Sequence, residues 1–205
     1  MTTSLPGFEV REKLYESARS LVFRAWDTEN DRSVVIKLLR NEHPGKAEIA
    51  RYRHEYEMLT KMAALKSVIN AYELGEHMNS VFMVLEDTGG ISLRKYMDGK
   101  ALPPVRFLSL AIHMAECLDE VHGSGFLHGD VKPSNFLYDP ADGRVALIDL
   151  DNAAPFTREG VPVILLDHLT GTLAYISPEQ TGRMNRRVDW RTDFYSLGVT
   201  FYEML

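Results

Sequence analysis

Several features that define whole classes of protein are scarce or missing in this sequence. Its 205 residues contain one cysteine, Cys117, which excludes an intramolecular disulfide framework and indicates a reducing compartment such as the cytoplasm. No apolar run is long enough to span a bilayer, and residues 1–13 lack the apolar segment of a signal peptide. A net charge of −6 without any basic run argues against binding to nucleic acid or to an anionic membrane.

What is present is an ordinary globular composition, with 45% hydrophobic and 25% charged residues, enough for one core or two small lobes. The first part of the chain has short segments rich in β-branched and aromatic residues, separated by polar turns. These segments predict strands over residues 8–14, 21–26, 33–39, 68–74 and 81–85. A helix is expected over residues 46–65, with an inward stripe of Ile49, Tyr52, Tyr56, Leu59 and Ala63.

Residues 87–90 break this pattern, and the chain beyond them is mainly helical. A short helix is expected over 92–97 and a long one from residue 103, followed by a hairpin of 136–138 and 145–148. The long helix has an apolar stripe of Leu108, Ala111, Ile112, Ala115 and Leu118. The last helix reaches Leu205 inside an apolar run without a C-cap, so we expect a chain truncated within this helix.

The strongest chemical signal is the segment 128–135, His-Gly-Asp-Val-Lys-Pro-Ser-Asn, which resembles the catalytic loop of protein kinases. In such a loop Asp130 orients the attacking hydroxyl and accepts its proton. Lys132 neutralises charge on the transferring phosphate, and Asn135 offers a neutral oxygen to magnesium. Taken alone, the segment is also compatible with a polar loop whose Asp and Asn cap turns.

A second acidic position favours the catalytic interpretation. Asp149 stands fourteen residues after Asn135, at the end of a predicted strand, where a kinase holds its main magnesium ligand. Magnesium prefers hard oxygen ligands and keeps water and phosphate in the rest of its shell. One carboxylate and one amide are therefore a plausible set of protein ligands.

Lys37 lies in an apolar predicted strand, whose alternation directs it to the same face as Val35. A buried lysine needs a partner, and Glu55, on the inward face of the predicted helix, is the candidate. The resemblance implies that Lys37 binds the α- and β-phosphates of ATP and that Glu55 positions it. The alternatives are an edge-strand lysine with its head in water and a solvated helix-face glutamate.

Further landmarks follow the catalytic loop. Residues 171–179, Gly-Thr-Leu-Ala-Tyr-Ile-Ser-Pro-Glu, resemble the end of an activation segment, in which Thr172 can touch the catalytic aspartate and Glu179 pairs with an arginine. Asp193 is similar to the helix-start aspartate that braces the catalytic-loop backbone, although an N-cap role is open as well. We expect His128 to brace the backbone rather than to act as a base.

The resemblance covers the whole chain and can be narrowed. Residues 14–17, 48–52 and especially 178–186 are similar to the N-terminal kinase domain of large bacterial hybrid sensors. In those proteins a serine/threonine-kinase-like domain precedes an ATPase-like region, a GAF domain and a histidine kinase. The resemblance therefore implies a protein substrate and further domains of the same chain as partners.

The implied fold is α+β and bilobal, like that of protein kinases. It has an N-lobe (1–86) with a five-stranded antiparallel sheet and one helix, a hinge (87–90), and a mainly helical C-lobe (91–205). The implied cofactors are ATP and Mg²⁺, and the implied reaction is transfer of the γ-phosphate to a serine or threonine hydroxyl. Adenine is expected between the lobes, against Val22, Val35, Leu137, the gatekeeper Leu85, and the hinge backbone of Glu86 and Thr88.

Three departures from the family pattern stand out. The expected glycine-rich loop carries Tyr15, Ser17 and Ser20 where glycines allow close approach to phosphate. Gly129 replaces the arginine that normally answers a phosphorylated activation loop. Asp151 replaces the glycine of the magnesium loop and adds negative charge where an anion must bind.

These departures keep two other functions open. The chain could be a pseudokinase that binds nucleotide as a regulatory module, or a small-molecule kinase of the aminoglycoside-phosphotransferase type. Residues 171–179 and Asp193 count against the second alternative. Thr157, Thr170 and Thr172 are possible phosphorylation sites, but without an arginine at 129 we expect activity not to depend on loop phosphorylation.

Overall fold

The computed structural model describes residues 5–41, 43–77, 80–156, 172–182 and 187–205. They form two compact units, Met1–Ala63 with Ile69–Thr88, and Ala64–Val68 with Gly89–Leu205. Thr157, Thr170 and the end of the hybrid-sensor motif at 183–186 lie outside the described residues. Within the described residues, no helix is long and apolar enough to cross a membrane.

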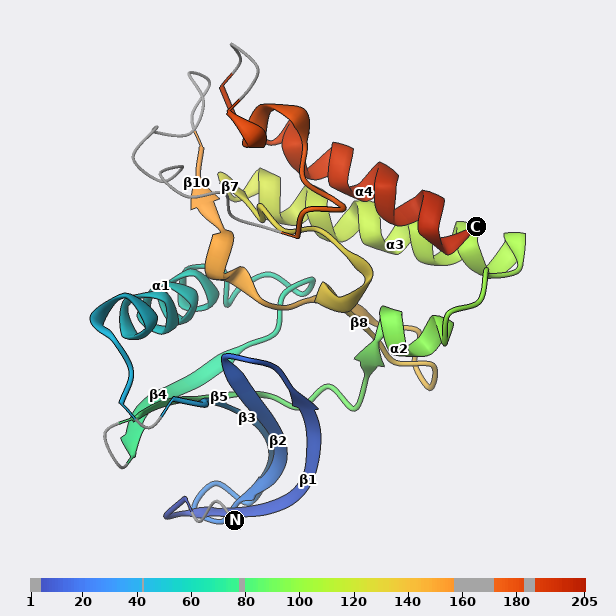
Figure 1. Ribbon diagram of the computed structural model, residues 1–205. Coiled ribbons are helices and arrows are strands. Elements are labelled where there is room, and N and C mark those ends of the chain that lie inside the picture. Colours follow the sequence, from blue (N-terminus) through green and yellow to red (C-terminus); the bar gives the residue numbers. More distant parts are fainter. Residues whose placement is uncertain (1–4, 42, 78–79, 157–171, 183–186) are drawn as a thin grey trace. The chain divides into compact units, whose positions relative to one another are not determined.

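The first unit contains a five-stranded sheet in the order β1-β2-β3-β5-β4, in which all neighbouring strands are antiparallel (Figure 1). The strands are β1 (Phe8–Glu16), β2 (Ser20–Asp27), β3 (Arg32–Leu39), β4 (Ala71–His77) and β5 (Ser80–Glu86). The α+β prediction with its five-stranded sheet is confirmed. The expected strand at 68–74 begins later, because Val68 forms an isolated bridge with Leu147 instead.

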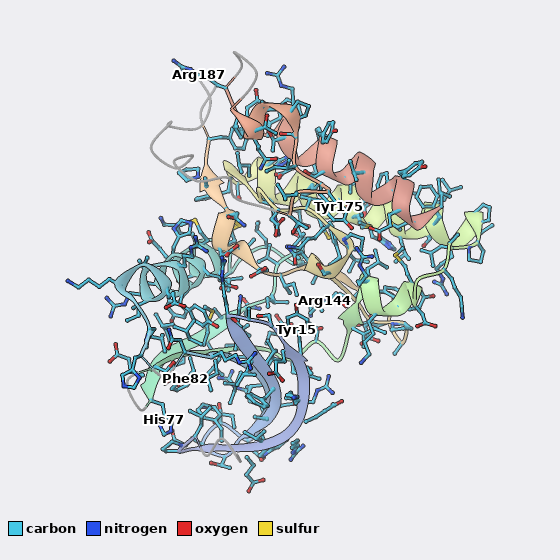
Figure 2. The ribbon with its side chains drawn as sticks, viewed as in Figure 1. Tyr15, His77, Phe82, Arg144, Tyr175 and Arg187 are labelled. Atoms are coloured by element: carbon cyan, nitrogen blue, oxygen red, sulfur yellow. The ribbon has the colours of Figure 1, made fainter. Side chains whose placement is uncertain are left out.

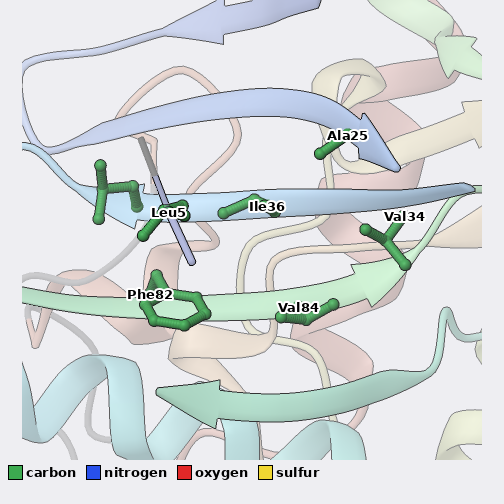
Figure 3. Packing of buried hydrophobic residues seen from close by; sticks show 7 residues of the cluster. Leu5, Ala25, Val34, Ile36, Phe82 and Val84 are labelled. Carbon is green, nitrogen blue, oxygen red and sulfur yellow. The ribbon is translucent and has the colours of Figure 1, made fainter. Parts of the chain in front are cut away.

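The two faces of this sheet have different roles. One face carries an apolar core of Ala25, Val34, Ile36, Leu38, Phe82 and Val84, which Leu5 also joins (Figure 3). On the opposite face, the strand register pairs Val22 with Lys37 and Val35 with Leu85. Because antiparallel partners point to the same side of a sheet, these four side chains share that second face.

One helix, α1 (Lys46–Lys61), belongs to the first unit and ends four residues before the predicted end. Its buried residues are Tyr52, Glu55, Met58 and Leu59. The predicted stripe was therefore displaced: Ile49 and Tyr56 are half-buried, and Ala63 is exposed.

The second unit is mainly helical. Among its described residues, the helices are α2 (Leu93–Met97), α3 (Pro104–Gly123) and α4 (Arg191–Met204). The same residues include the short 3₁₀ turns η1 (Pro133–Asn135), η2 (Leu150–Asn152) and η4 (Pro178–Thr181). The strands are β6 (Ile91–Ser92), β7 (Phe126–Leu127), β8 (Phe136–Tyr138), β9 (Val145–Leu147) and β10 (Ala154–Pro155). β6, β8 and β9 form one small sheet, which includes the predicted hairpin, and β7 pairs with β10. The catalytic-loop residues lie between β7 and β8.

The predicted apolar stripe of α3 was only partly right: Leu118 is buried and Ala111 half-buried, but Leu108, Ile112 and Ala115 are exposed. The buried residues are Leu110, Met114, Cys117, Leu118 and Val121. By contrast, Leu108 and Ile112 are each 58% exposed. The helix carries two apolar stripes at similar spacing, and its neighbours decide which one is covered: α4 runs beside it, with the rings of Phe107 and Phe201 5.6 Å apart, and Cys117 Sγ lies 3.5 Å from Val145 O of β9 (Figure 1).

Candidate active site

In the first unit, Lys37 and Glu55 form a buried ion pair. Lys37 Nζ donates to both carboxylate oxygens of Glu55 at 2.7 Å, and the side chains are 14% and 3% exposed. The ammonium also lies 5.7 Å from the ring centroid of Tyr52, whose hydroxyl bonds Ser20 Oγ at 2.7 Å. The pair is thus held between β3 and α1, with the lysine half-buried on the second face of the sheet.

The residues expected to contact adenine fall in both units. Val22 and Val35 are half-buried, and Leu85 is 5% exposed at the end of β5. Glu86 is fixed by Asn70, whose N–H and Nδ2 each donate to the Glu86 carboxylate at 3.0 Å. Thr88 follows in the same unit, whereas Leu137 is a half-buried residue of β8 in the second unit.

The turn between β1 and β2 is closed by its own serine. Ser17 Oγ accepts from the N–H of Arg19 at 3.2 Å and from the N–H of Ser20 at 3.0 Å. Ser17 N–H donates to Ser20 O at 2.9 Å, and Tyr15 is 62% exposed (labelled in Figure 2). Two amides that a phosphate-binding turn would offer to a ligand are therefore already bonded within the turn.

In the second unit, the Asp130 carboxylate is held from three directions. Lys132 Nζ donates to Asp130 Oδ2, and Thr172 N–H donates to Asp130 Oδ1 at 2.9 Å. Asn135 Nδ2 donates to Asp130 O at 2.9 Å and to Oδ2 at 3.3 Å. Lys132 Nζ also bonds Thr172 Oγ1 at 2.7 Å, so the structure brings together four of the predicted site residues.

The backbone before Asp130 is held by hydrogen bonds to buried side chains. Asp193, fully buried at the start of α4, accepts from the N–H groups of His128 and Gly129, each at 2.8 Å, and bonds His122 Nε2 at 2.8 Å. His128 Nδ1 accepts from Asp130 N–H at 3.3 Å, so its Nε2–H is the donor to Ile148 O at 3.1 Å. Both ring nitrogens of His128 are thus engaged with backbone.

The candidate magnesium ligands come from neighbouring segments. Ile148 N–H donates to Asn135 O at 3.0 Å, which fixes the backbone before Asp149 beside Asn135. Asp149 has a left-handed backbone, with φ 66° and ψ 66°, and is followed by η2. Within the described residues, no group of three or more His, Cys, Asp and Glu could hold a metal. The donors are one amide and one carboxylate, which suits magnesium bound largely through phosphate and water.

The structure explains one departure from the family pattern and qualifies another. Gly129 has φ +79°, and a Cβ at this position would lie 2.7 Å from Asn152 O, so a side chain here would meet backbone. Asp151 is half-buried in η2, and its Oδ1 accepts from Asn152 Nδ2 at 2.9 Å. Its negative charge is therefore partly engaged by a neighbouring amide.

Sequence reasoning missed a polar cluster around Tyr175, which is labelled beside α4 in Figure 2. Arg94 Nη2 of α2 donates to the Tyr175 hydroxyl at 2.6 Å, and both residues bond Glu203 of α4. Burial and the hydrogen bond to Glu203 raise the pKa of Tyr175 to about 12. No local sequence pattern predicts this cluster, because its members are far apart in the sequence and are residue types that are common on protein surfaces.

Two further residues are Glu179, which was expected to pair with an arginine, and the single cysteine, Cys117. Glu179 Oε1 accepts from Thr192 Oγ1 at 2.9 Å, at the start of α4. Burial raises the pKa of the Cys117 thiol to about 12, as expected for a packed, unreactive cysteine. Neither observation adds a reactive group to the site.

Known proteins are similar to this chain over nearly its whole length. The family model described as "Protein kinase domain" matches residues 8–205. A probable serine/threonine-protein kinase of Clostridium perfringens is 30% identical over 97% of this chain and 28% of its own length. The serine/threonine-protein kinase PknL of Mycobacterium tuberculosis is 31% identical over 96% of this chain and 48% of its own length. The chain thus spans less than half the length of these curated relatives.

Proposed function

Because the chain belongs to the protein kinase domain family, we propose that it is the catalytic domain of a serine/threonine-protein kinase. The reaction is transfer of the γ-phosphate of ATP to a hydroxyl of a protein substrate. The observation that carries the proposal is the arrangement around Asp130, whose carboxylate is held by Lys132, Asn135 and the backbone of Thr172.

The residues of the second unit would act on the substrate hydroxyl and on the transferring phosphate. Asp130 orients the hydroxyl and accepts its proton, and the surrounding hydrogen bonds fix the direction of the carboxylate. Lys132, already bonded to Asp130, places a positive charge where negative charge moves during transfer. Asp193 and His128 keep the loop backbone in place.

Nucleotide and metal would be held by the remaining residues. Lys37 binds the α- and β-phosphates and Glu55 positions it, while Val22, Val35, Leu85, Leu137 and the backbone of Glu86 and Thr88 contact adenine. Asn135 and Asp149 offer oxygen ligands to Mg²⁺, which when bound neutralises phosphate charge. The ion pair between Lys37 and Glu55 supports the proposed phosphate-binding role of Lys37. The bond from Ile148 N–H to Asn135 O supports the proposed pairing of Asn135 and Asp149 as metal ligands.

The test is phosphate transfer from radiolabelled ATP to a mixture of serine- and threonine-containing peptides. Wild-type protein should transfer phosphate with magnesium and not with EDTA. Asp130→Asn should lower turnover by at least about a thousandfold and leave ATP affinity unchanged, because the carboxylate acts in the chemical step. Turnover of the variant at the wild-type rate would remove Asp130 from the mechanism, and equal ATP affinity in EDTA would remove the metal site.

A second candidate, a pseudokinase that binds nucleotide without transfer, is favoured by the turn between β1 and β2. Ser17 occupies amides there that a phosphate could use, and Asp151 adds negative charge. Magnesium-dependent ATP binding without any detectable transfer would select this function. The relatives reported above are named as serine/threonine-protein kinases, which gives no support to a small-molecule kinase.

The setting of the domain is also part of the proposal. We place it in the cytoplasm, because it has one buried cysteine and ATP as its cosubstrate. The resemblance of residues 178–186 to hybrid sensors supports ATPase-like, GAF and histidine-kinase domains as partners in the same protein. The coding sequence around this chain tests that architecture directly.

A further inference from the structure

Gly129, the residue before Asp130, contributes only its peptide groups to the catalytic loop. Its φ of +79° and the 2.7 Å approach of a hypothetical Cβ to Asn152 O leave no room for a side chain. Its N–H donates to buried Asp193. Any further link from this position to the rest of the second unit must therefore reach its carbonyl oxygen.

That carbonyl is bonded by Gln180, a half-buried residue of η4. Gln180 Nε2 donates to Gly129 O at 3.1 Å. The other end of the same amide, Oε1, accepts from Ser177 N–H at 2.9 Å. Ser177 is fully buried, and its hydroxyl bonds Thr192 Oγ1 at 3.3 Å beside Asp193. One side-chain amide thus joins the catalytic loop to the segment before α4.

This segment touches the catalytic loop a second time at its other end. Thr172 N–H donates to Asp130 Oδ1, five residues before Ser177. Thr172 therefore fixes the Asp130 side chain, while Gln180 fixes the peptide that precedes it. The two contacts bracket residues 173–179 and make the position of Asp130 depend on the order of that segment.

We infer that Gln180 is a positioning residue that holds the Gly129–Asp130 peptide and so sets the placement of the catalytic carboxylate. The inference rests on the proposed function for its effect on turnover. Its competitor is a purely local role, in which Gln180 only caps the first turn of η4 through Ser177 N–H. The two roles use different atoms of the amide, so substitutions can separate them.

Gln180→Glu keeps an acceptor for Ser177 N–H but loses the donor to Gly129 O and places a carboxylate against that carbonyl. Gln180→Met has similar length and loses both bonds. For positioning, both variants should lower kcat about fivefold with KM for ATP unchanged, the effect expected from one lost hydrogen bond. Both should also speed amide hydrogen exchange in residues 128–131, whereas a purely local cap role predicts a lower melting temperature for Gln180→Met alone.

A matched control is Glu48→Met in the first unit. Glu48 Oε2 likewise accepts a cap bond, from Gly45 N–H at 2.9 Å, at the start of α1. Its loss should leave exchange in 128–131 unchanged. Wild-type kcat and wild-type exchange in Gln180→Glu would overturn the inference and leave only the cap. If wild-type protein transfers no phosphate, the proposed function fails, and the exchange rates still decide the role of Gln180.

Discussion

The turn between β1 and β2 and the catalytic loop both depart from the kinase pattern, but with different consequences. In the turn, Ser17 takes the place of a glycine and bonds the N–H groups of Arg19 and Ser20. In the catalytic loop, Gly129 replaces an arginine, and Asp130 still receives bonds from Lys132 and Thr172. The first change occupies groups that a ligand would use, whereas the second leaves the proposed chemical groups in place.

We therefore predict that this chain differs from ordinary kinases more in its affinity for ATP than in the phosphate-transfer step. A backbone amide that is bonded inside its own turn gains little from a new ligand, because one hydrogen bond is exchanged for another. Four variants test nucleotide binding and the groups that hold the proposed site in place, from the largest expected effect to the smallest.

The first variant tests the ion pair between Lys37 and Glu55 in the first unit. Glu55→Ala removes both bonds that Lys37 Nζ donates to Glu55, so the lysine, whose side chain is only 14% exposed, loses this counter-charge. We expect the free energy of unfolding to fall by about 3 kcal/mol, measured by urea denaturation, and ATP affinity to fall with it. Glu76→Ala is the control, since Glu76 and its partner Arg53 are 74% and 63% exposed, and should change stability by less than about 0.5 kcal/mol. Similar losses in both variants would show that the Lys37–Glu55 pair is no more than a surface contact.

The pairing of Lys37 with Glu55 could be predicted from the sequence because two independent patterns agree. Strand alternation directs Lys37 inward, and helical spacing does the same for Glu55, so each buried charge demands the other. The catalytic loop was accessible for a similar reason, since three chemical groups lie within residues 128–135 and their spacing is set by local chain geometry. Short-range spacing thus predicted these parts of the candidate site.

Contacts decided by tertiary packing were not predictable in this way. The long helix α3 has two apolar stripes, and periodicity favoured Leu108 and Ile112, which are exposed, over Leu110 and Met114, which are buried. The bonds of Gln180 to Gly129 and of Ser17 to its own turn involve common polar residues with no distinctive spacing. Only the folded backbone brings their partners within reach.

The second variant, Asp151→Gly, tests a departure in the second unit. A carboxylate several ångströms from a triphosphate would repel it by roughly 2–4 kcal/mol at an effective dielectric of about 20. Magnesium and the bond from Asn152 Nδ2 reduce this repulsion. We therefore expect about tenfold tighter binding of magnesium-ATP by calorimetry. Weaker binding would instead make Asp151 a working metal ligand and remove one support of the pseudokinase alternative.

The third variant, Tyr175→Phe, tests how the segment after Thr172 is anchored. Burial and Glu203 raise the pKa of Tyr175 to about 12, so the unfolded chain, with a tyrosine pKa of about 10, loses its proton first. The contribution to stability is therefore complete below about pH 10 and is lost as pH rises towards about 12. Since Arg94 and Glu203 are 49% and 30% exposed, we expect a loss of about 1 kcal/mol.

The measurement for Tyr175 is urea unfolding of wild type and Tyr175→Phe at pH 9, below the pH range in which the contribution is lost, and at pH 11.5, within that range. The stability difference between the two proteins should shrink by that amount at the higher pH, while ionisation of the other tyrosines cancels. A difference that stays constant would mean that the hydroxyl of Tyr175 ionises equally easily in both states.

The last test returns to the turn and has the smallest expected effect. Ser17→Gly removes the hydroxyl that accepts from Arg19 and Ser20 N–H and restores the freedom of a glycine at this position. Loss of the internal bonds should cost about 0.5–1 kcal/mol of stability. The released amides become available to phosphate, so we expect magnesium-ATP to bind about threefold more tightly, a gain smaller than one full hydrogen bond because the turn must be ordered again.

Ser17→Ala separates the two causes, since it frees the same amides without adding backbone freedom. Tighter binding in both variants would identify the occupied amides as the reason for a weak grip, and tighter binding in Gly alone would identify backbone stiffness. Unchanged affinity in both would mean that this turn does not contact the triphosphate, and the expected weak binding of ATP would then have to rest on Asp151.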